Sequence, residues 1–105
     1  MSEELKTIEL TGYGETYKVY LSITKYLNDE TQTAVQFYTT NHEPFMNLSV
    51  NLNDPSLKEN FFWAKTWSEN EPFRQQLLDS GLFRDTGKRK RTGFVEAELW
   101  EIVRN

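Results

Sequence analysis

Apolar and polar residues alternate over several short stretches of the chain, a pattern typical of β-strands with one buried face. The two clearest stretches are residues 17–24 and 45–52, each with four apolar side chains on one predicted face. Further strands are predicted at residues 5–10, 34–39, 61–67 and 94–103. The last of these carries large apolar side chains on both faces, so we expect it to be a central or covered strand.

Helical spacing is clear in one segment, residues 70–80, within the stretch from Ser68 to Gly81. Phe73, Leu77 and Leu78 form its apolar stripe. Asn70 is suited to cap its start, Pro72 fits its first turn, and Gly81 supplies a left-handed stop.

Together these elements predict an α+β fold: a mostly antiparallel sheet of five to six strands, with one main helix at about 70–80 packed on it. A single helical turn is also expected at 57–60, and a loop at 85–93. One domain is expected to cover residues 1–105, with an ordered core at about 5–102, because 105 residues is a common length for one domain.

The amino-acid composition limits the kinds of site that the chain can form. The chain has no cysteine, which excludes disulfides, thiolate catalysis and Cys-based metal sites. Its apolar runs are too short to cross a membrane and no secretory signal is visible, so we expect a cytoplasmic protein. Aromatic residues make up 14% of the chain, and we expect them to supply much of the buried area.

Charge is unevenly distributed. The net charge is −4, yet five of the twelve basic residues lie within 84–91. In the loop predicted there, four charges would be presented together, by Lys88, Arg89, Lys90 and Arg91. Such a loop could contact phosphates of a nucleic acid or bind a partner. We favour the alternative of a solvated loop whose charges offset nearby acids.

Signs of catalysis are missing. The chain has no nucleophile motif and no glycine-rich phosphate loop. His42, the one histidine, lies in a predicted turn and is interpreted as a surface residue. Glu96 is the remaining candidate, for a small-molecule pocket near Trp100, although a solvated position is more common for an acid. We therefore predict no enzyme activity and no cofactor or metal.

A second candidate surface is the polar side of the sheet. Tyr20 and Tyr38 are expected there beside Asn47 and Asn51, a mixture suited to protein contacts. Trp63 and Trp67 are expected to share one face of their strand, where they could form an exposed aromatic patch.

Short motifs in the second half carry a resemblance. In order they are Glu43-Pro44-Phe45, Leu48-Ser49-Val50-Asn51-Leu52, Ser80-Gly81-Leu82, Thr86-Gly87, Thr92-Gly93-Phe94 and Leu99-Trp100. Over residues 14–102 the chain resembles a family of small bacterial proteins, catalogued as a domain of unknown function, that occur in phages, plasmids and other mobile elements. The resemblance implies a shared fold, in which Phe45 and Phe94 are interpreted as core residues, and it implies no catalytic residues.

Three hypotheses follow. The leading one is a non-enzymatic binding protein, an accessory factor of a mobile element that docks on a protein of the host or the element. The second is a nucleic-acid-binding module that uses residues 88–91. The third is a small-molecule pocket or enzyme near Glu96.

Overall fold

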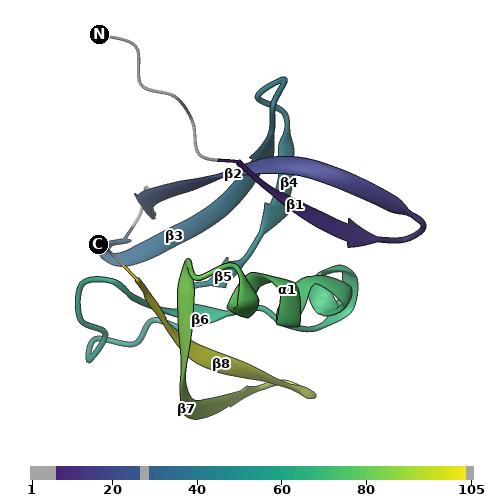
Figure 1. Ribbon diagram of the computed structural model, residues 1–105. Coiled ribbons are helices and arrows are strands. Elements are labelled where there is room, and N and C mark those ends of the chain that lie inside the picture. Colours follow the sequence, from purple (N-terminus) through teal and green to yellow (C-terminus); the bar gives the residue numbers. More distant parts are fainter. Residues whose placement is uncertain (1–6, 27–28, 104–105) are drawn as a thin grey trace, which may run out of the picture.

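The computed structural model describes residues 7–26 and 29–103 and shows two four-stranded antiparallel sheets with a helical segment between them (Figure 1). The first sheet has the order β1 (Thr7–Gly12), β2 (Glu15–Tyr26), β3 (Asp29–Thr39), β4 (Pro44–Asn47). The second has the order β5 (Ser49–Val50), β6 (Phe61–Ala64), β8 (Val95–Ile102), β7 (Phe83–Thr92). The α+β class with antiparallel strands and one helix is confirmed, but the single sheet of five to six strands is wrong.

The chain changes sheets at Leu48, which explains the second sheet. The backbone N–H of Leu48 donates to the carbonyl of Val35 in the first sheet, and its carbonyl accepts from the N–H of Lys65 next to β6. Residues 45–52 were predicted as one strand, but they form β4 in one sheet and β5 in the other. Bends of this kind make the corners between packed sheets. Ser49, which alternates with the apolar residues of this stretch, is buried there; its hydroxyl accepts a hydrogen bond from the N–H of Val35 and shares another with the hydroxyl of Tyr26.

The helical segment fills one end of the space between the sheets (Figure 1). It begins as a 3-10 helix, η1 (Ser68–Phe73), and continues as α1 (Arg74–Asp79). Asn70 does not cap it; the side chain is buried and donates to the carbonyls of Asn47 and Lys65. Gly81 has a φ of 83°, the left-handed conformation expected after the helix.

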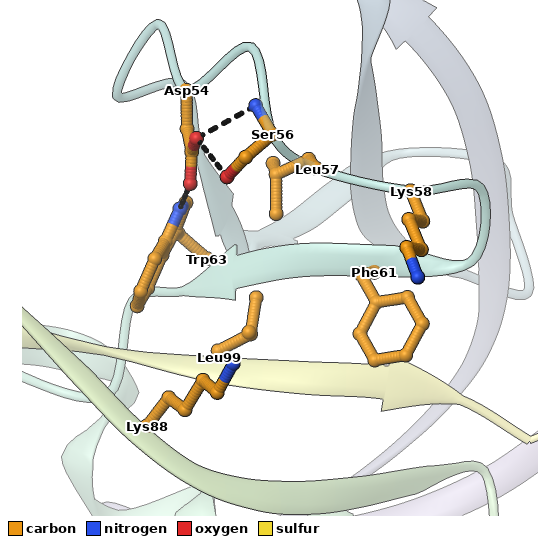
Figure 2. Close-up of a pocket in the computed structure, with 8 residues that line it drawn as sticks. All are labelled: Asp54, Ser56, Leu57, Lys58, Phe61, Trp63, Lys88 and Leu99. Carbon is orange, nitrogen blue, oxygen red and sulfur yellow. Dashed lines mark hydrogen bonds between the residues drawn. The ribbon is translucent and has the colours of Figure 1, made fainter.

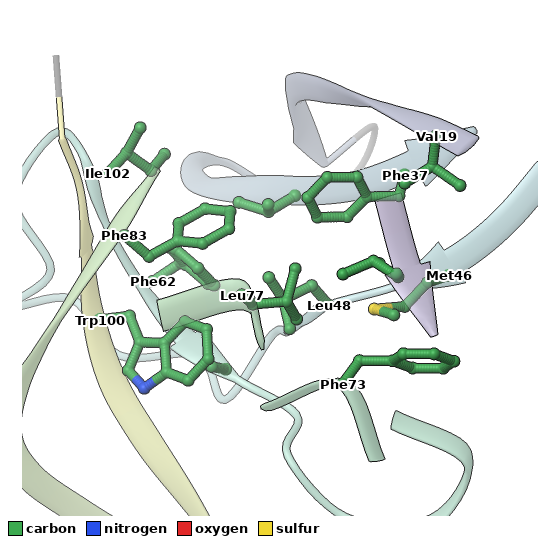
Figure 3. Close-up of a cluster of buried hydrophobic side chains, with 13 residues drawn as sticks. Val19, Phe37, Met46, Leu48, Phe62, Phe73, Leu77, Phe83, Trp100 and Ile102 are labelled. Atoms are coloured by element: carbon green, nitrogen blue, oxygen red, sulfur yellow. The ribbon is translucent and has the colours of Figure 1, made fainter. Parts of the chain in front are cut away.

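One hydrophobic core lies between the two sheets and the helical segment (Figure 3). Phe37 of the first sheet meets Phe83 of the second edge to face, with ring centroids 6.2 Å apart. Trp100 and Phe62 are almost fully buried beside Phe83, and Leu77 of α1 packs against the same cluster. The aromatic residues therefore do supply much of the core.

Several local predictions are corrected. Residues 57–60 contain a turn at 59–60 rather than a helical turn, and the strand predicted at 61–67 ends at Ala64. The loop predicted at 85–93 is most of β7, which pairs with β8. Phe94 occupies the turn of that hairpin and is fully exposed, so it is not a core residue. β8 lies between β6 and β7, which confirms the expected central strand. No helix among the described residues is long and apolar enough to cross a membrane.

Candidate functional site

The basic run lies on the edge strand β7, and strand geometry divides its charges. Because successive side chains of a strand point to opposite faces, Lys88 and Lys90 share one face of the second sheet, and Arg89 and Arg91 share the other. The register is set after a bulge: Arg89 pairs with Glu98, and Arg91 pairs with Glu96. The four charges are therefore not presented together, as the loop prediction had required.

Arg89 is held by carboxylates on the face that looks toward the helix. Its guanidinium donates to both oxygens of Asp85, at 2.8 Å each, and lies 3.7 Å from Glu98. Arg74 of α1 donates to Glu98 at 2.9 Å and reaches Asp85 at 3.3 Å. Two arginines and two carboxylates thus form one ionic cluster that ties the helix to the β7–β8 hairpin. Arg89 is occupied within the fold and is not available as a free cation.

A groove opens on the other face of the second sheet, between the segment 54–58 and β7 (Figure 2). Its apolar surface comes from Leu57, Phe61, Trp63 and Leu99, and its polar groups from Asp54, Ser56, Lys58 and Lys88. Its volume is about 250 Å³. Lys58 and Lys88 enter it from opposite sides, with Phe61 and Leu99 between them (Figure 2). We call this site the lysine-rimmed groove.

Asp54 fixes one wall of the lysine-rimmed groove. One carboxylate oxygen accepts hydrogen bonds from the N–H and the hydroxyl of Ser56, at 2.9 and 2.5 Å. The other accepts from the indole N–H of Trp63 at 3.0 Å. These bonds, those from Ser56 first, lower the pKa of Asp54, so the carboxylate stays ionised at neutral pH. Both carboxylate oxygens of Asp54 are therefore used within the protein, where they hold the segment 54–58 on the sheet.

Positive charge dominates the mouth of the groove. Lys90 lies beside it, with its ammonium 5.9 Å from the centre of the Trp63 ring. Lys58, Lys88 and Lys90 are exposed, and none forms an ion pair with a carboxylate whose side chain the structure describes. Three ammonium groups therefore lie in or beside a groove lined by one carboxylate, Asp54, which already accepts hydrogen bonds from Ser56 and Trp63. The site combines apolar contact area with cations that form no ion pair with a described carboxylate.

The predicted tyrosine surface is partly assembled on the outer face of the first sheet. Tyr20 and Tyr38 are paired across β2 and β3, and their rings stack with centroids 5.8 Å apart. Hydrogen bonds continue the row through Gln36 to Asn47. The hydroxyl of Tyr20 lies 2.8 Å from Nδ1 of His42, which is exposed, as expected.

Three residues predicted for that surface lie elsewhere. Asn51 follows β5, where its side chain accepts a hydrogen bond from the N–H of Asn53. Trp63 is only 6% exposed, because the loop held by Asp54 covers it, and Trp67 is partly buried at the start of η1. The exposed patch of Trp63 and Trp67 is therefore not present.

The shielded acid near Trp100 is Glu98 rather than the predicted Glu96. Glu96 is exposed, whereas Glu98 has a side chain only 12% exposed within the ionic cluster. Trp100 is fully buried in the packed core, although its indole N–H donates to Glu98. Neither Glu96 nor Trp100 lines the lysine-rimmed groove. Among the side chains that the structure describes, no group of three or more His, Asp or Glu residues could hold a metal ion.

Sequence reasoning identified Lys88 and Lys90 but missed their neighbours. Lys58, Leu57 and Phe61 were assigned to a helical turn and a strand, with no functional interpretation. One usable signal was Asp54-Pro55-Ser56, a turn in which an aspartate can bind the hydroxyl two residues later. Nothing local in the sequence places Lys58 opposite Lys88.

Comparisons with protein-family models, curated protein sequences and solved structures gave no significant match to this chain. The resemblance to a mobile-element family therefore stays a prediction.

Proposed function

We propose that this protein is a non-enzymatic binding protein that docks on a partner protein, and that the lysine-rimmed groove takes an acidic segment of the partner with one apolar side chain. The observation that carries the proposal is an apolar surface beside Lys58, Lys88 and Lys90, none of which forms an ion pair with a carboxylate whose side chain the structure describes. Following the resemblance noted above, the partner would be a protein of a host cell or of the mobile element itself.

The size of the groove favours a side chain over a cofactor. Pockets for drug-sized ligands and cofactors span roughly 300–1,000 Å³. The groove holds about 250 Å³ and is open along one side, so it suits one apolar anchor of a longer chain. Phe61 and Leu99 supply contact for that anchor. Carboxylates on either side of the anchor would meet the lysines.

Charge complementarity supports the acidic character of the partner segment. Charged groups arranged to match a partner mainly raise the association rate and select the partner. Three cations around a small apolar area favour a segment with carboxylates close to its anchor. A basic segment would be repelled at the same place.

Nucleic acid fits these observations less well. Phosphate binding by the run 88–91 would need several free cations along one line. Arg89 is engaged by Asp85 and Glu98, and strand alternation sends Arg91 to the other face. Outside residues 84–91 the chain carries a large excess of acids, which repels a long polyanion.

The test is selection from a random dodecapeptide display library on the immobilised full chain. We expect enrichment of peptides in which Asp or Glu residues flank a Leu, Ile or aromatic residue. A synthetic peptide with the enriched sequence should then bind the wild type with a dissociation constant that rises steeply with salt.

Two double variants make a matched comparison, because each removes two exposed lysine or arginine charges and gives the same net charge. Lys58→Ala with Lys88→Ala should weaken binding of the enriched peptide at least tenfold. Lys18→Ala with Arg91→Ala, on other faces, should change it less than twofold. Equal losses in the two variants, no enrichment, or enrichment of basic peptides would each overturn the proposal. Tighter binding of a fifteen-nucleotide oligothymidine than of any peptide would favour the nucleic-acid hypothesis instead.

A further inference from the structure

A second pocket lies away from the lysine-rimmed groove, where the β1–β2 hairpin and β4 meet η1. Four aromatic rings line it, those of Tyr13, Tyr17, Phe45 and Phe73, together with the side chain of Glu69. Its volume is about 110 Å³. This space is far smaller than a cofactor needs and suits a group of only a few heavy atoms. We call it the aromatic pocket.

The rings of the aromatic pocket are held at different angles. Tyr17 and Phe45 have centroids 4.8 Å apart at a 46° tilt, and both rings meet Phe73 edge to face. Phe73 also meets Tyr13 edge to face, at 6.0 Å. Rings in such arrangements do not cover one another fully, so parts of their electron-rich faces stay available to a ligand.

Tyr13 is fixed in place although it is exposed. The residue is 64% exposed, and its hydroxyl donates to the backbone carbonyl of Glu69 at 2.9 Å. The neighbouring Gly12 lets Phe73 approach the hairpin, because a Cβ at Gly12 would lie 2.7 Å from the Phe73 ring. The hydrogen bond joins Tyr13 to a residue 56 positions later in the chain, so the exposed ring is held in one orientation. It therefore forms a preorganised wall of the pocket.

The ring faces, rather than an unpaired carboxylate, are what favours a cation in the aromatic pocket. Glu69 accepts a hydrogen bond from Nζ of Lys65 at 2.7 Å; hydrogen bonds, that from Lys65 first, lower the pKa of Glu69 to about 2, so the carboxylate is charged near neutral pH but already paired with one cation. The pKa of Tyr17 is raised, first by burial and then by a side-chain hydrogen bond with Glu15. A cation held by ring faces gains further from nearby carboxylates.

We infer that the aromatic pocket binds a quaternary ammonium group, held over the rings of Tyr13, Tyr17 and Phe45 with Glu69 at its edge. Aromatic rings that surround a methylated ammonium are the usual way proteins recognise this chemistry. A trimethylammonium head has four heavy atoms and matches the small volume. This inference is independent of the function proposed for the lysine-rimmed groove.

The experiment compares choline with 3,3-dimethyl-1-butanol, which has the same shape but no charge. Each is titrated into the full chain while the aromatic proton resonances are followed by NMR. We expect choline to shift the Tyr13 and Phe45 resonances saturably, and the neutral compound to bind about tenfold more weakly, as the loss of a cation–π contact implies. Equal affinities for the two compounds, or no saturable shift with choline, would contradict the inference, and neither result depends on a variant.

Variants then locate the site. Phe45→Leu, which keeps apolar volume but removes the ring, should weaken choline binding about tenfold. Phe94→Leu, at an exposed ring outside the pocket, should leave it unchanged and serves as the matched control. A larger loss of choline affinity in Phe94→Leu than in Phe45→Leu would place the choline site outside the aromatic pocket and contradict the inference. Acetylated trimethyl-lysine amide is titrated in parallel: tighter binding than choline assigns the ligand to a modified protein side chain, and weaker binding assigns it to a small molecule.

Discussion

Replacing Glu98 with glutamine should destabilise the fold through the ionic cluster. The Glu98 carboxylate accepts two hydrogen bonds from Arg74, at 2.9 and 3.0 Å, and one from the indole of Trp100 at 3.0 Å. Its side chain is 12% exposed, so little water can replace these partners. Glutamine keeps the shape and one acceptor but removes the charge. Arg74 and Arg89 are then left with Asp85 as their shared anion.

The size of the loss follows from burial. A hydrogen bond to a charged group contributes about 1.5–3 kcal/mol, and breaking a fully buried ion pair costs about 3–5 kcal/mol. Arg74 has a side chain 32% exposed, so water recovers part of its solvation. We therefore expect Glu98→Gln to lower the free energy of unfolding by about 2 kcal/mol. The matched control is Glu101→Gln on the same strand, whose partner Arg84 is 58% exposed. It should cost less than about 1 kcal/mol.

The contribution of Glu98 to the free energy of unfolding should decrease as the pH falls. Burial acts to raise the pKa of Glu98, but hydrogen bonds from Arg74 and Trp100 together with nearby arginine charges lower it below the ordinary value. A carboxylate with a lowered pKa stabilises the fold above its unfolded pKa, and this contribution is lost as the pH falls through the folded pKa. The difference between wild type and Glu98→Gln should be complete at pH 7 and shrink below about pH 4.

Urea unfolding followed by tryptophan fluorescence, at pH 7 and at pH 3, measures both quantities. Equal costs of Glu98→Gln and Glu101→Gln at pH 7 would refute the stabilising role of the ionic cluster. A cost of Glu98→Gln that is unchanged at pH 3 would refute it as well.

Two further substitutions test the fold. Leu48→Ala leaves a cavity at a fully buried position where the chain changes sheets. Measured by urea unfolding, it should lower the free energy of unfolding by about 2–5 kcal/mol. A loss under about 1 kcal/mol would mean that Leu48 is not a core residue. Gly87→Ala should lower the free energy of unfolding by about 1–2 kcal/mol because Gly87 has a φ of 87°, and Gly87→Asn should lower it less. No heavy atom lies within 4 Å of a Cβ added at Gly87, so steric contact is not a competing cause. Equal losses in the two variants would show that backbone conformation is not the cause either.

Much of the fold could be predicted where strand pairing agrees with the local pattern. Residues 17–24 alternate cleanly, and β2 buries Val19 and partly buries Leu21 as expected. Residues 45–52 alternate just as well, yet they form two strands. The change of sheet depends on the hydrogen bond that the N–H of Leu48 donates to Val35 and the one that its carbonyl accepts from Lys65, which no local pattern reveals.

The candidate site shows the same limit. A run of lysine and arginine between glycines has low strand propensity and was interpreted as a loop. Pairing with β8 makes it a strand, and the partners of Arg89 then decide which charges are free. An exposed patch at Trp63 was one hypothesis, because strand alternation turns Trp63 away from Phe62. A loop held by Asp54 covers that second face, and the sequence does not show that long-range contact.

The proposal that an acidic segment docks in the lysine-rimmed groove is best examined by NMR mapping. The enriched acidic peptide is titrated into the ¹⁵N-labelled chain while amide and indole N–H resonances are followed. We predict that the shifts concentrate on the segment 54–63 and on Lys88 and Leu99, and include the indole N–H of Trp63. Shifts confined to Tyr20, Tyr38 and the outer face of the first sheet would contradict the proposal.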